Sequence, residues 1–166
     1  MSGAALDALT SAGIPHRVIR HGPVRSVAEA AEVIGVAVPD VVKTIVVRRG
    51  EHDFVFVLVP GDRVISWPKL RAVLGVNRLS LPGADEARSA TGYERGTITP
   101  FGSHTAWPVV ADERIRGRTI TLGTGEHGAA VALAADEALA ALATPSTSTT
   151  IADVTDPEPP VRRPSG

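Results

Sequence analysis

A lysine interrupts the most apolar stretch of this sequence. Lys43 lies within residues 41–47, V-V-K-T-I-V-V, a run that is β-branched nearly throughout and predicts a strand. Alternation along a strand places Lys43 on the same face as Ile45 and Val47. Burial disfavours a charged amine, so a lysine here, with no acidic neighbour in sequence, invites a ligand carboxyl, carbonyl or phosphate oxygen. The alternative is a lysine whose stem crosses the core edge while its ammonium reaches water.

A second feature that could carry chemistry is the glycine-rich segment 91–102, T-G-Y-E-R-G-T-I-T-P-F-G. Its glycines let backbone amides approach a substrate closely, and Pro100 stiffens the approach. Such amides can orient a carbonyl or stabilise an oxyanion without side chains. A loop of this length inside a compact domain is often functional. The alternative is an ordinary connecting segment.

Several other chemistries find little support. The chain has no cysteine, which excludes disulfides, thiolate zinc sites and a cysteine nucleophile. The histidines show no ligand spacing, so we expect neither a metal site nor a cofactor. These scattered residues are His16, His21, His52, His104 and His127.

Two motifs are interpreted as decoys. Residues 123–128 fit G-x-G-x-x-G, but a dinucleotide site needs a further strand with an acid about 20 residues on. Ser26 begins an S-x-x-E capping box with Glu29, which explains it without a nucleophilic role. No G-x-S-x-G elbow indicates a serine hydrolase.

The surrounding elements are predicted to mix helices and strands. Residues 41–47 and 54–59 should form a hairpin that is apolar on both faces and hence deeply buried. The apolar share is 43% with only 4% aromatic, so Val, Ile, Leu and Ala must fill the core. We expect helices over residues 4–12, 27–34, 66–74, 84–90 and 135–143, and further strands over 16–21, 77–81, 109–111, 118–122 and 130–133.

The length of 166 residues indicates one domain, over residues 1–143, followed by a flexible tail over 144–166 that is rich in Pro, Ser and Thr. The net charge of −1 and pI of about 6.5 argue against autonomous tight binding of nucleic acid. Contact with one end of an RNA would need few phosphate contacts. The N-terminus lacks a signal-peptide pattern and no stretch approaches a membrane span, so we expect a cytoplasmic protein without a membrane partner.

The motifs together resemble a known family. The run at 41–47, T-G-Y at 91–93, and G-x-x-x-P at 96–100 followed by Gly102 are similar to the signature of the YbaK/ProX (prolyl-tRNA synthetase-associated) aminoacyl-tRNA deacylases. The resemblance extends in order from about residue 5 to residue 143 and includes G-x-x-G at 125–128. Each motif is weak alone, and their ordered combination is far more specific.

This resemblance implies an α/β (mixed α+β) fold on a strongly curved, mostly antiparallel sheet with flanking helices. It implies hydrolysis in trans of the ester that joins a small amino acid, such as Ala, Ser or Cys, to a tRNA such as tRNA(Pro). The partners would be the acceptor end of the aminoacyl-tRNA and an aminoacyl-tRNA synthetase. The implied catalytic residues are Lys43, as an electrostatic anchor, and Gly96, whose backbone faces the ester. The implied substrate-binding residues are His21, Thr44, Thr97, Ile98, Pro100, Gly102 and Gly125.

One departure from the family keeps other functions open. Some members carry a carboxylate just after the glycine that matches Gly128, where this chain has Ala129 and Ala130. A cysteinyl substrate is therefore not assumed, and a non-catalytic module that binds an aminoacyl group, a tRNA end or a protein is the alternative. A hydrolase for a small ester without RNA is a third reading.

Overall fold

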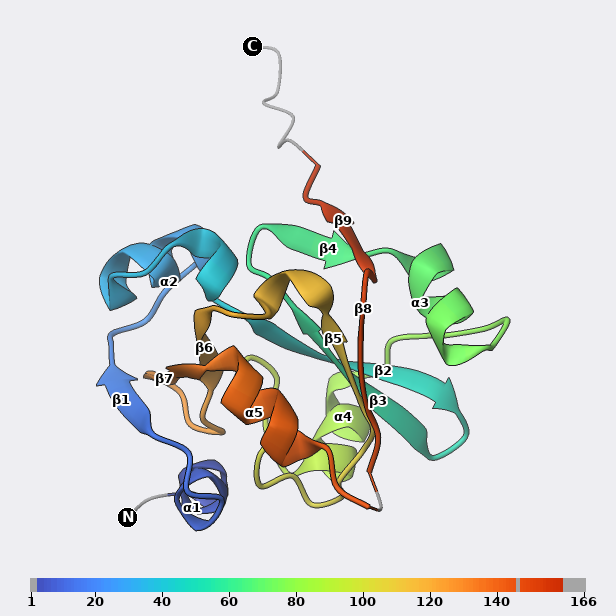
Figure 1. Ribbon diagram of the computed structural model, residues 1–166, viewed down its shortest axis with the longest axis horizontal. Coiled ribbons are helices and arrows are strands. Elements are labelled where there is room, and N and C mark those ends of the chain that lie inside the picture. Colours follow the sequence, from blue (N-terminus) through green and yellow to red (C-terminus); the bar gives the residue numbers. More distant parts are fainter. Residues whose placement is uncertain (1–2, 146, 160–166) are drawn as a thin grey trace.

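Helices and strands alternate along the chain in the computed structural model, which describes residues 3–145 and 147–159 (Figure 1). The predicted mixed α/β class is confirmed. In order, the elements are α1 (Ala4–Ser11), β1 (His16–Arg20), α2 (Val27–Ile34), η1 (Val38–Asp40), β2 (Lys43–Gly50), β3 (Asp53–Val59), β4 (Arg63–Ile65), α3 (Trp67–Leu74), α4 (Ala84–Thr91), β5 (Val109–Asp112), η2 (Glu113–Ile115), β6 (Thr119–Gly123), β7 (Ala129–Ala134), α5 (Ala135–Leu142), β8 (Thr149–Ala152) and β9 (Thr155–Pro157).

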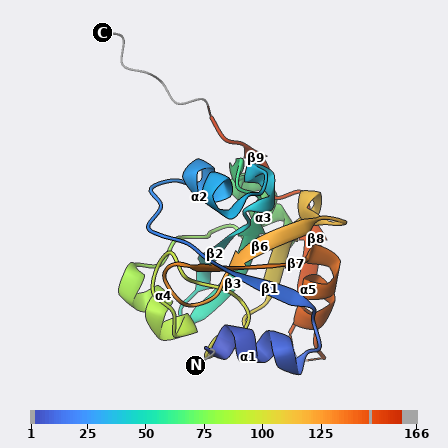
Figure 2. The ribbon, with the colours of Figure 1, turned by 90° about the vertical axis from the view of Figure 1, so that its left-hand side faces the viewer.

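The described strands form three sheets, and most of their pairings are antiparallel. The largest has the order β2-β3-β5-β8, in which β3 pairs antiparallel with β2 and parallel with β5, and β5 pairs parallel with β8. A second sheet, β1-β7-β6, is antiparallel throughout and faces the viewer in Figure 2, with α1 beneath it. The third is the pair β4-β9. A parallel bridge between Val41 and Thr121 links the first two sheets where β2 begins.

Strand β3 lies at the centre of the core because both of its faces are apolar. Phe54, Phe56 and Leu58 point into one cluster of buried side chains, and the alternating valines of β3 point into a second cluster on the other face. The first cluster is covered by α1, α5 and the β1-β7-β6 sheet, and the second by α3. The predicted deep hairpin of β2 and β3 is therefore confirmed.

Local capping signals fix where α2 begins. The Ser26 hydroxyl accepts a hydrogen bond from the Glu29 amide at 3.0 Å, as the capping-box pattern predicts. The Glu29 carboxylate returns to the Arg25 amide at 3.2 Å, one residue before the cap. The predicted strand over 77–81 is reduced to one bridge between Ser80 and Arg48, because Leu81 is exposed and Pro82 follows.

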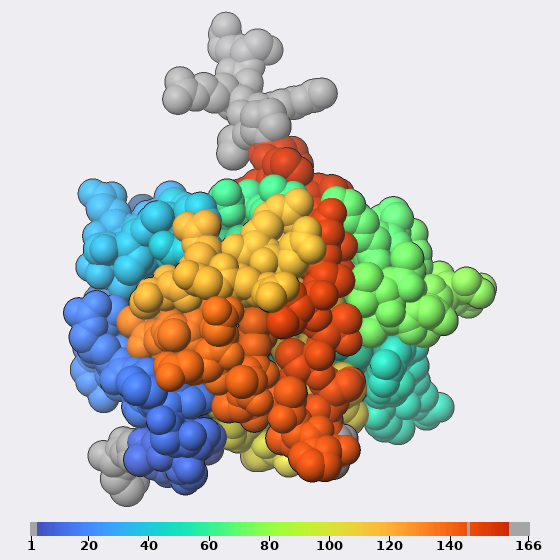
Figure 3. Space-filling view, viewed as in Figure 1, coloured from blue at the N-terminus to red at the C-terminus, as the bar shows by residue number. Residues whose placement is uncertain are grey.

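Residues 149–158, which we term the C-terminal strap, add β8 to the edge of the largest sheet and pair β9 with β4. The prediction of a flexible tail was wrong for this segment, because it forms β8 and β9, while residues 160–166 lie outside the described part of the chain. Val154 is fully buried in the second cluster, which contributes about 1.5–3 kcal/mol of burial free energy. Figure 3 shows the strap, in red, between the green surface around α3 and the yellow surface around η2. The folded unit therefore extends through β9.

Asp153 of the strap predicts a loss of stability in acid. Hydrogen bonds from Arg114 and Lys69 hold the pKa of its carboxyl at about 2, below the ordinary 3.8. Because the folded-state pKa is the lower one, this stabilisation is complete above about pH 4 and is lost as the pH falls toward 2. We expect the thermal midpoint of the wild type to fall over this window, and that of Asp153→Asn to start lower at neutral pH and fall less. Thermal denaturation followed by circular dichroism measures both, and equal acid slopes would contradict the assignment.

Among the described residues, no helix is long and apolar enough to cross a bilayer.

Candidate active site

A cavity of about 250 Å³ lies where the two larger sheets meet. Its walls come from α2 and the segment before it, the start of β2, the end of β6, the start of β7, and the glycine-rich loop. Most of the lining is apolar, and the polar side chains are few. The lining residues are His21, Val24, Ala30, Ile34, Val41, Val42, Lys43, Thr44, Gly96, Ile98, Thr121, Leu122, Gly123, Ala129 and Ala130.

Lys43 is the cationic residue of this lining, and its side chain is half-buried. Its Nζ donates a hydrogen bond to the backbone carbonyl of Arg63 at 2.8 Å. Burial lowers the pKa of the amine, and the carboxylates of Glu158 and Asp62 partly oppose that shift. Lys43 is therefore neither a fully solvated lysine nor one shut inside the core, and only one of its three N–H donors is used by the described residues.

The acceptor for Lys43 reaches its place because of Gly61. A Cβ atom at this position would lie 2.2 Å from the Val38 carbonyl oxygen and 2.8 Å from that of Val41. Only glycine allows the turn between β3 and β4 to approach η1 so closely. The turn then places the Arg63 carbonyl beside the first residue of β2.

Gly96 is an exposed residue of the glycine-rich loop and lines the same cavity as Lys43. Its φ of 89° is in the left-handed region, and no atom lies within 4 Å of the position a Cβ would take. Its glycine is therefore required by the backbone conformation and not by crowding. No hydrogen bond among the described residues uses the amide of Gly96 or that of Ile98. Both amides remain free for a bound molecule.

The T-G-Y motif holds this loop in place. The Thr91 hydroxyl donates to the Ala87 carbonyl at 2.9 Å and accepts from the Tyr93 amide at 3.1 Å. The buried Tyr93 hydroxyl donates to the Phe101 carbonyl at 2.8 Å, which closes the loop on itself. Burial also raises the pKa of Tyr93.

At the tip of the loop, the Thr97 amide and hydroxyl both donate to the Glu94 carbonyl, at 3.0 and 2.7 Å. The motif therefore positions the loop and takes no direct part in lining the cavity.

Thr44 follows Lys43 on β2 and also lines the cavity. Its Oγ1 is buried and has no hydrogen-bond partner among the described residues. His21, at the cavity edge, is bonded through Nδ1 to the Gly22 carbonyl at 2.8 Å, which leaves its Nε2 available.

The structure brings five of the nine predicted site residues to this cavity: His21, Lys43, Thr44, Gly96 and Ile98. The other four belong to the framework of the loop. Thr97 is buried with its hydroxyl bonded to Glu94, and Gly125 packs on Tyr93, whose ring would lie 2.4 Å from a Cβ. Pro100 and Gly102 line a separate apolar cavity beside α1 and α5. Gly102 also packs against the backbone of Ala4 in α1.

The sequence reading missed much of the apolar wall. Ala30 and Ile34 were detectable in principle, because they share one face of α2 at i, i+4 spacing. Gly123 had no signal of its own: a Cβ there would lie 3.0 Å from the Thr97 carbonyl, so this glycine lets the loop approach β6. The Arg63 carbonyl is a backbone atom, and its role depends on a contact 20 residues away in the chain.

A second hollow of about 620 Å³ adjoins the first along the outer edge of β2. The two share Lys43, Thr44, Gly96 and Ile98, so these four residues stand between them. Arg95, Leu81 and Pro82 line its outer part. A ligand with a small group in the first cavity could extend its larger part here. Among the described residues, no cluster of three His, Asp or Glu side chains could hold a metal ion.

Comparison with known proteins relates this chain to one family. Residues 21–141 match the family model of the aminoacyl-tRNA editing domain. The chain is 34% identical over 110 residues to the proline–tRNA ligase of Trichlorobacter lovleyi, and 37% identical over 93 residues to that of Thermosipho africanus. These alignments cover 66% and 56% of this chain but only 18% and 16% of the ligases. The chain thus spans less than a fifth of the length of these relatives.

Solved structures resemble nearly the whole chain. A proposed trans-editing enzyme for prolyl tRNA synthetase superposes with a TM-score of 0.81 at 26% identity, covering 94% of this chain and 99% of the other. A hypothetical protein of known crystal structure superposes with a TM-score of 0.82 at 25% identity, covering 93% and 100%. The expected fold is therefore confirmed along nearly the whole chain.

Proposed function

Because this chain belongs to the aminoacyl-tRNA editing domain family, we propose that it is an aminoacyl-tRNA deacylase, which hydrolyses the ester of a mischarged tRNA in trans. The observation that carries the proposal is the shared cavity of Lys43 and Gly96. An amine with free N–H donors and a loop with free amides lie around one small apolar hollow. This combination suits the binding of an aminoacyl ester.

The chemistry needs little beyond positioning and electrostatics. Water attacks the ester carbonyl, the bond to the ribose oxygen breaks, and the ribose hydroxyl leaves with a proton. Backbone amides of the loop, such as those of Gly96 and Ile98, would stabilise the oxyanion. Lys43 would anchor a substrate oxygen with the donors that Arg63 leaves free, and the substrate's own adjacent hydroxyl would assist. No covalent intermediate is required, because the ester is already activated.

The lining supports a small aminoacyl group. Val24, Ala30, Ile34, Ala129 and Ala130 contribute no charge to the cavity wall. A cavity of about 250 Å³ has room for the aminoacyl group of Ala, Ser or Cys. The proposed role is the second sieve of editing, in which a site hydrolyses those products that are small enough to enter it.

The decisive test is a panel of mischarged tRNAs given to the purified protein. It should include Ala, Ser and Cys on tRNA(Pro), the same amino acids on unrelated tRNAs, and free aminoacyl esters. Hydrolysis of at least one small aminoacyl-tRNA, faster than of its free ester, is expected. Equal rates on free esters would favour a hydrolase that ignores RNA.

Gly96→Ala tests the loop backbone against a matched control. Gly117 has a similar φ of 73° and equally open space around its Cβ position, but it lies between η2 and β6, outside the cavity lining. Both substitutions should lower the unfolding free energy by about 1–2 kcal/mol, because alanine disfavours this conformation. Only Gly96→Ala should also reduce kcat/KM, on the order of tenfold or more. Equal losses of activity in the two variants would remove the loop from the mechanism.

The second candidate is a binding module without turnover. Ala129 and Ala130 line the cavity where some family members have a carboxylate, so this wall supplies no acid or base. Saturable binding of an aminoacyl-tRNA with no release of amino acid would favour this function.

Both functions require that the protein binds aminoacyl-tRNA. We propose the cytoplasm as its compartment and a synthetase as a further partner.

A further inference from the structure

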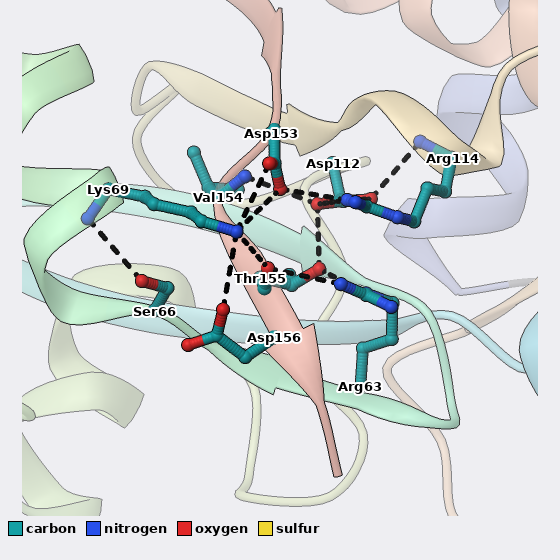
Figure 4. A network of polar contacts seen from close by, with 9 residues as sticks. All are labelled: Arg63, Ser66, Lys69, Asp112, Arg114, Asp153, Val154, Thr155 and Asp156. Atoms are coloured by element: carbon teal, nitrogen blue, oxygen red, sulfur yellow. Dashed lines mark hydrogen bonds and ion pairs between the residues drawn. The ribbon is translucent and has the colours of Figure 1, made fainter.

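A chain of hydrogen bonds leads from Lys43 to the C-terminal strap. The Arg63 carbonyl that accepts from Lys43 Nζ belongs to the residue whose guanidinium binds Thr155 (Figure 4). Arg63 Nε donates to Thr155 Oγ1 at 2.6 Å, and its Nη2 donates to the Thr155 carbonyl at 3.2 Å. Thr155 Oγ1 in turn donates to Asp112 Oδ2 at 2.8 Å. Four residues from four separate strands are thus linked.

The far end of this chain is fixed in the core. Asp112 and Thr155 are both fully buried, and Asp112 Oδ2 also accepts from the Val154 amide at 3.2 Å. Arg114 Nη1 donates to both oxygens of the Asp112 carboxylate, each at 3.2 Å. Lys69 holds the strap from α3, donating to the Thr155 carbonyl at 2.9 Å. A buried, fully bonded threonine cannot move without breaking these contacts.

The strap also brings charge to Lys43. The Glu158 amide donates to the Asp62 carbonyl at 3.1 Å. This bond holds Glu158 of the strap beside the residue that precedes Arg63. Their carboxylates raise the pKa of Lys43 against the effect of burial. Among the described residues, Arg63 directs its guanidinium to Thr155, and Arg95 and His21 line the two cavities that Lys43 also lines.

We propose that the C-terminal strap is a positioning element of the active site. Thr155 fixes, through Arg63, the carbonyl that holds the Lys43 amine, and Glu158 supplies a counter-charge to the same amine. The inference rests on the proposed function for its catalytic meaning, while the link between strap and amine is a property of the protein alone. A strap that only covered the apolar cluster with Val154 would need no contact with the residue that binds Lys43.

The sequence makes the link directly measurable, because the chain has only two lysines, Lys43 and Lys69. The pKa values of the two amines are shifted in opposite directions. Burial lowers the pKa of Lys43, and the hydrogen bonds that Lys69 donates to Asp153 and Asp156 raise the pKa of Lys69. In full-length protein with isotope-labelled lysine, nuclear magnetic resonance titration resolves both. Glu158→Gln should lower the pKa of Lys43 and leave Lys69 unchanged. Asp156→Asn, which removes the carboxylate 3.2 Å from Lys69, should lower the pKa of Lys69 and leave that of Lys43 unchanged.

The hydroxyl of Thr155 is tested by activity. Thr155→Val removes both hydrogen bonds of Oγ1 at nearly constant volume, and Thr155→Ser retains them. Relative to Thr155→Ser, we expect kcat/KM of Thr155→Val to fall on the order of tenfold. The Lys43 resonance should also shift in Thr155→Val, which a role confined to stability would not cause.

These outcomes separate the two proposals. If the wild type hydrolyses no mischarged tRNA but Glu158→Gln shifts only Lys43, the deacylase proposal fails and the link between strap and amine stands. If the wild type is active, and Lys43 titrates identically in the wild type, Glu158→Gln and Thr155→Val, the inference is overturned. Because Glu158 is exposed, Glu158→Gln can be tested even if Thr155→Val does not fold.

Discussion

Replacement of Lys43 by alanine is expected to abolish deacylation while the protein stays folded. The substitution removes the cationic side chain from the cavity lining, and with it the anchor for a substrate oxygen. Loss of one such electrostatic contact lowers kcat/KM on the order of 10²–10³-fold. Stability should change little, because burial disfavours the charged amine and its one hydrogen bond is to a backbone carbonyl.

The control for this experiment separates charge from packing. Lys43→Met keeps a long unbranched stem without the amine, so it should be as inactive as Lys43→Ala. Thermal denaturation shows whether both variants remain folded, and single-turnover hydrolysis measures activity. Near-wild-type hydrolysis by either variant on every mischarged tRNA tried would remove the proposed role.

The pH dependence of the wild type gives the same test from another side. If the charged amine binds substrate, activity is present below the pKa of Lys43 and is lost as the pH rises through it. That pKa lies below the ordinary 10.5 of lysine, so the loss should begin at lower pH than for a solvated lysine. Rates must be corrected for spontaneous hydrolysis of the ester, which grows in base.

Replacement of Asp112 by alanine should cause the largest loss of stability. This fully buried carboxylate accepts hydrogen bonds from the Val154 amide, the Thr155 hydroxyl and Arg114. Its removal leaves the buried Val154 amide without its acceptor and the Thr155 hydroxyl without the group to which it donates. We expect the unfolding free energy to fall by about 3–5 kcal/mol, because two buried donors lose their acceptor, each at about 1–3 kcal/mol, and the contact with Arg114 is lost as well.

Asp53→Ala is the matched control, because Asp53 also makes a bidentate pair with an arginine, Arg49, but on the surface of the β2–β3 hairpin. Its effect should stay within about 0.5–1 kcal/mol. Urea denaturation of the two variants measures the difference. Similar losses in both would show that Asp112 does not anchor the strap.

The parts that the sequence predicted well depend on local signals. The β-branched run around Lys43 and the continuous apolar run of β3 predict a hairpin that is buried on both faces. The Ser26 cap and the glycines that end α2, α3 and α4 lie within four residues of the groups they serve. Lys43 and Gly96 were proposed as site residues from residue type and from the resemblance to the family, and their roles stay predictions.

The parts that were missed depend on distant partners. The strap looks disordered because most of its residues are polar, yet Val154 and Thr155 are fully buried. Their ordering depends on Asp112, which precedes them by more than 40 residues and carries no mark of its role. Thr97, Pro100, Gly102 and Gly125 were predicted to bind substrate from the resemblance to the family. In the structure Thr97 bonds to Glu94, Gly125 packs on Tyr93 and Gly102 packs on α1, so residues of a motif also preserve the frame around a site.

The parallel pairing of β8 with β5 bears on how such a unit can be moved between proteins. The family match ends at residue 141, so a domain transplanted on that boundary would end within α5 and lack β8 and β9. Such a fragment would expose the edge of β5, which favours edge-to-edge aggregation. It would also remove the Val154 amide and the Thr155 hydroxyl, which donate hydrogen bonds to Asp112. A transplantable version must carry β8 and β9 with it, or receive an equivalent strand from its host.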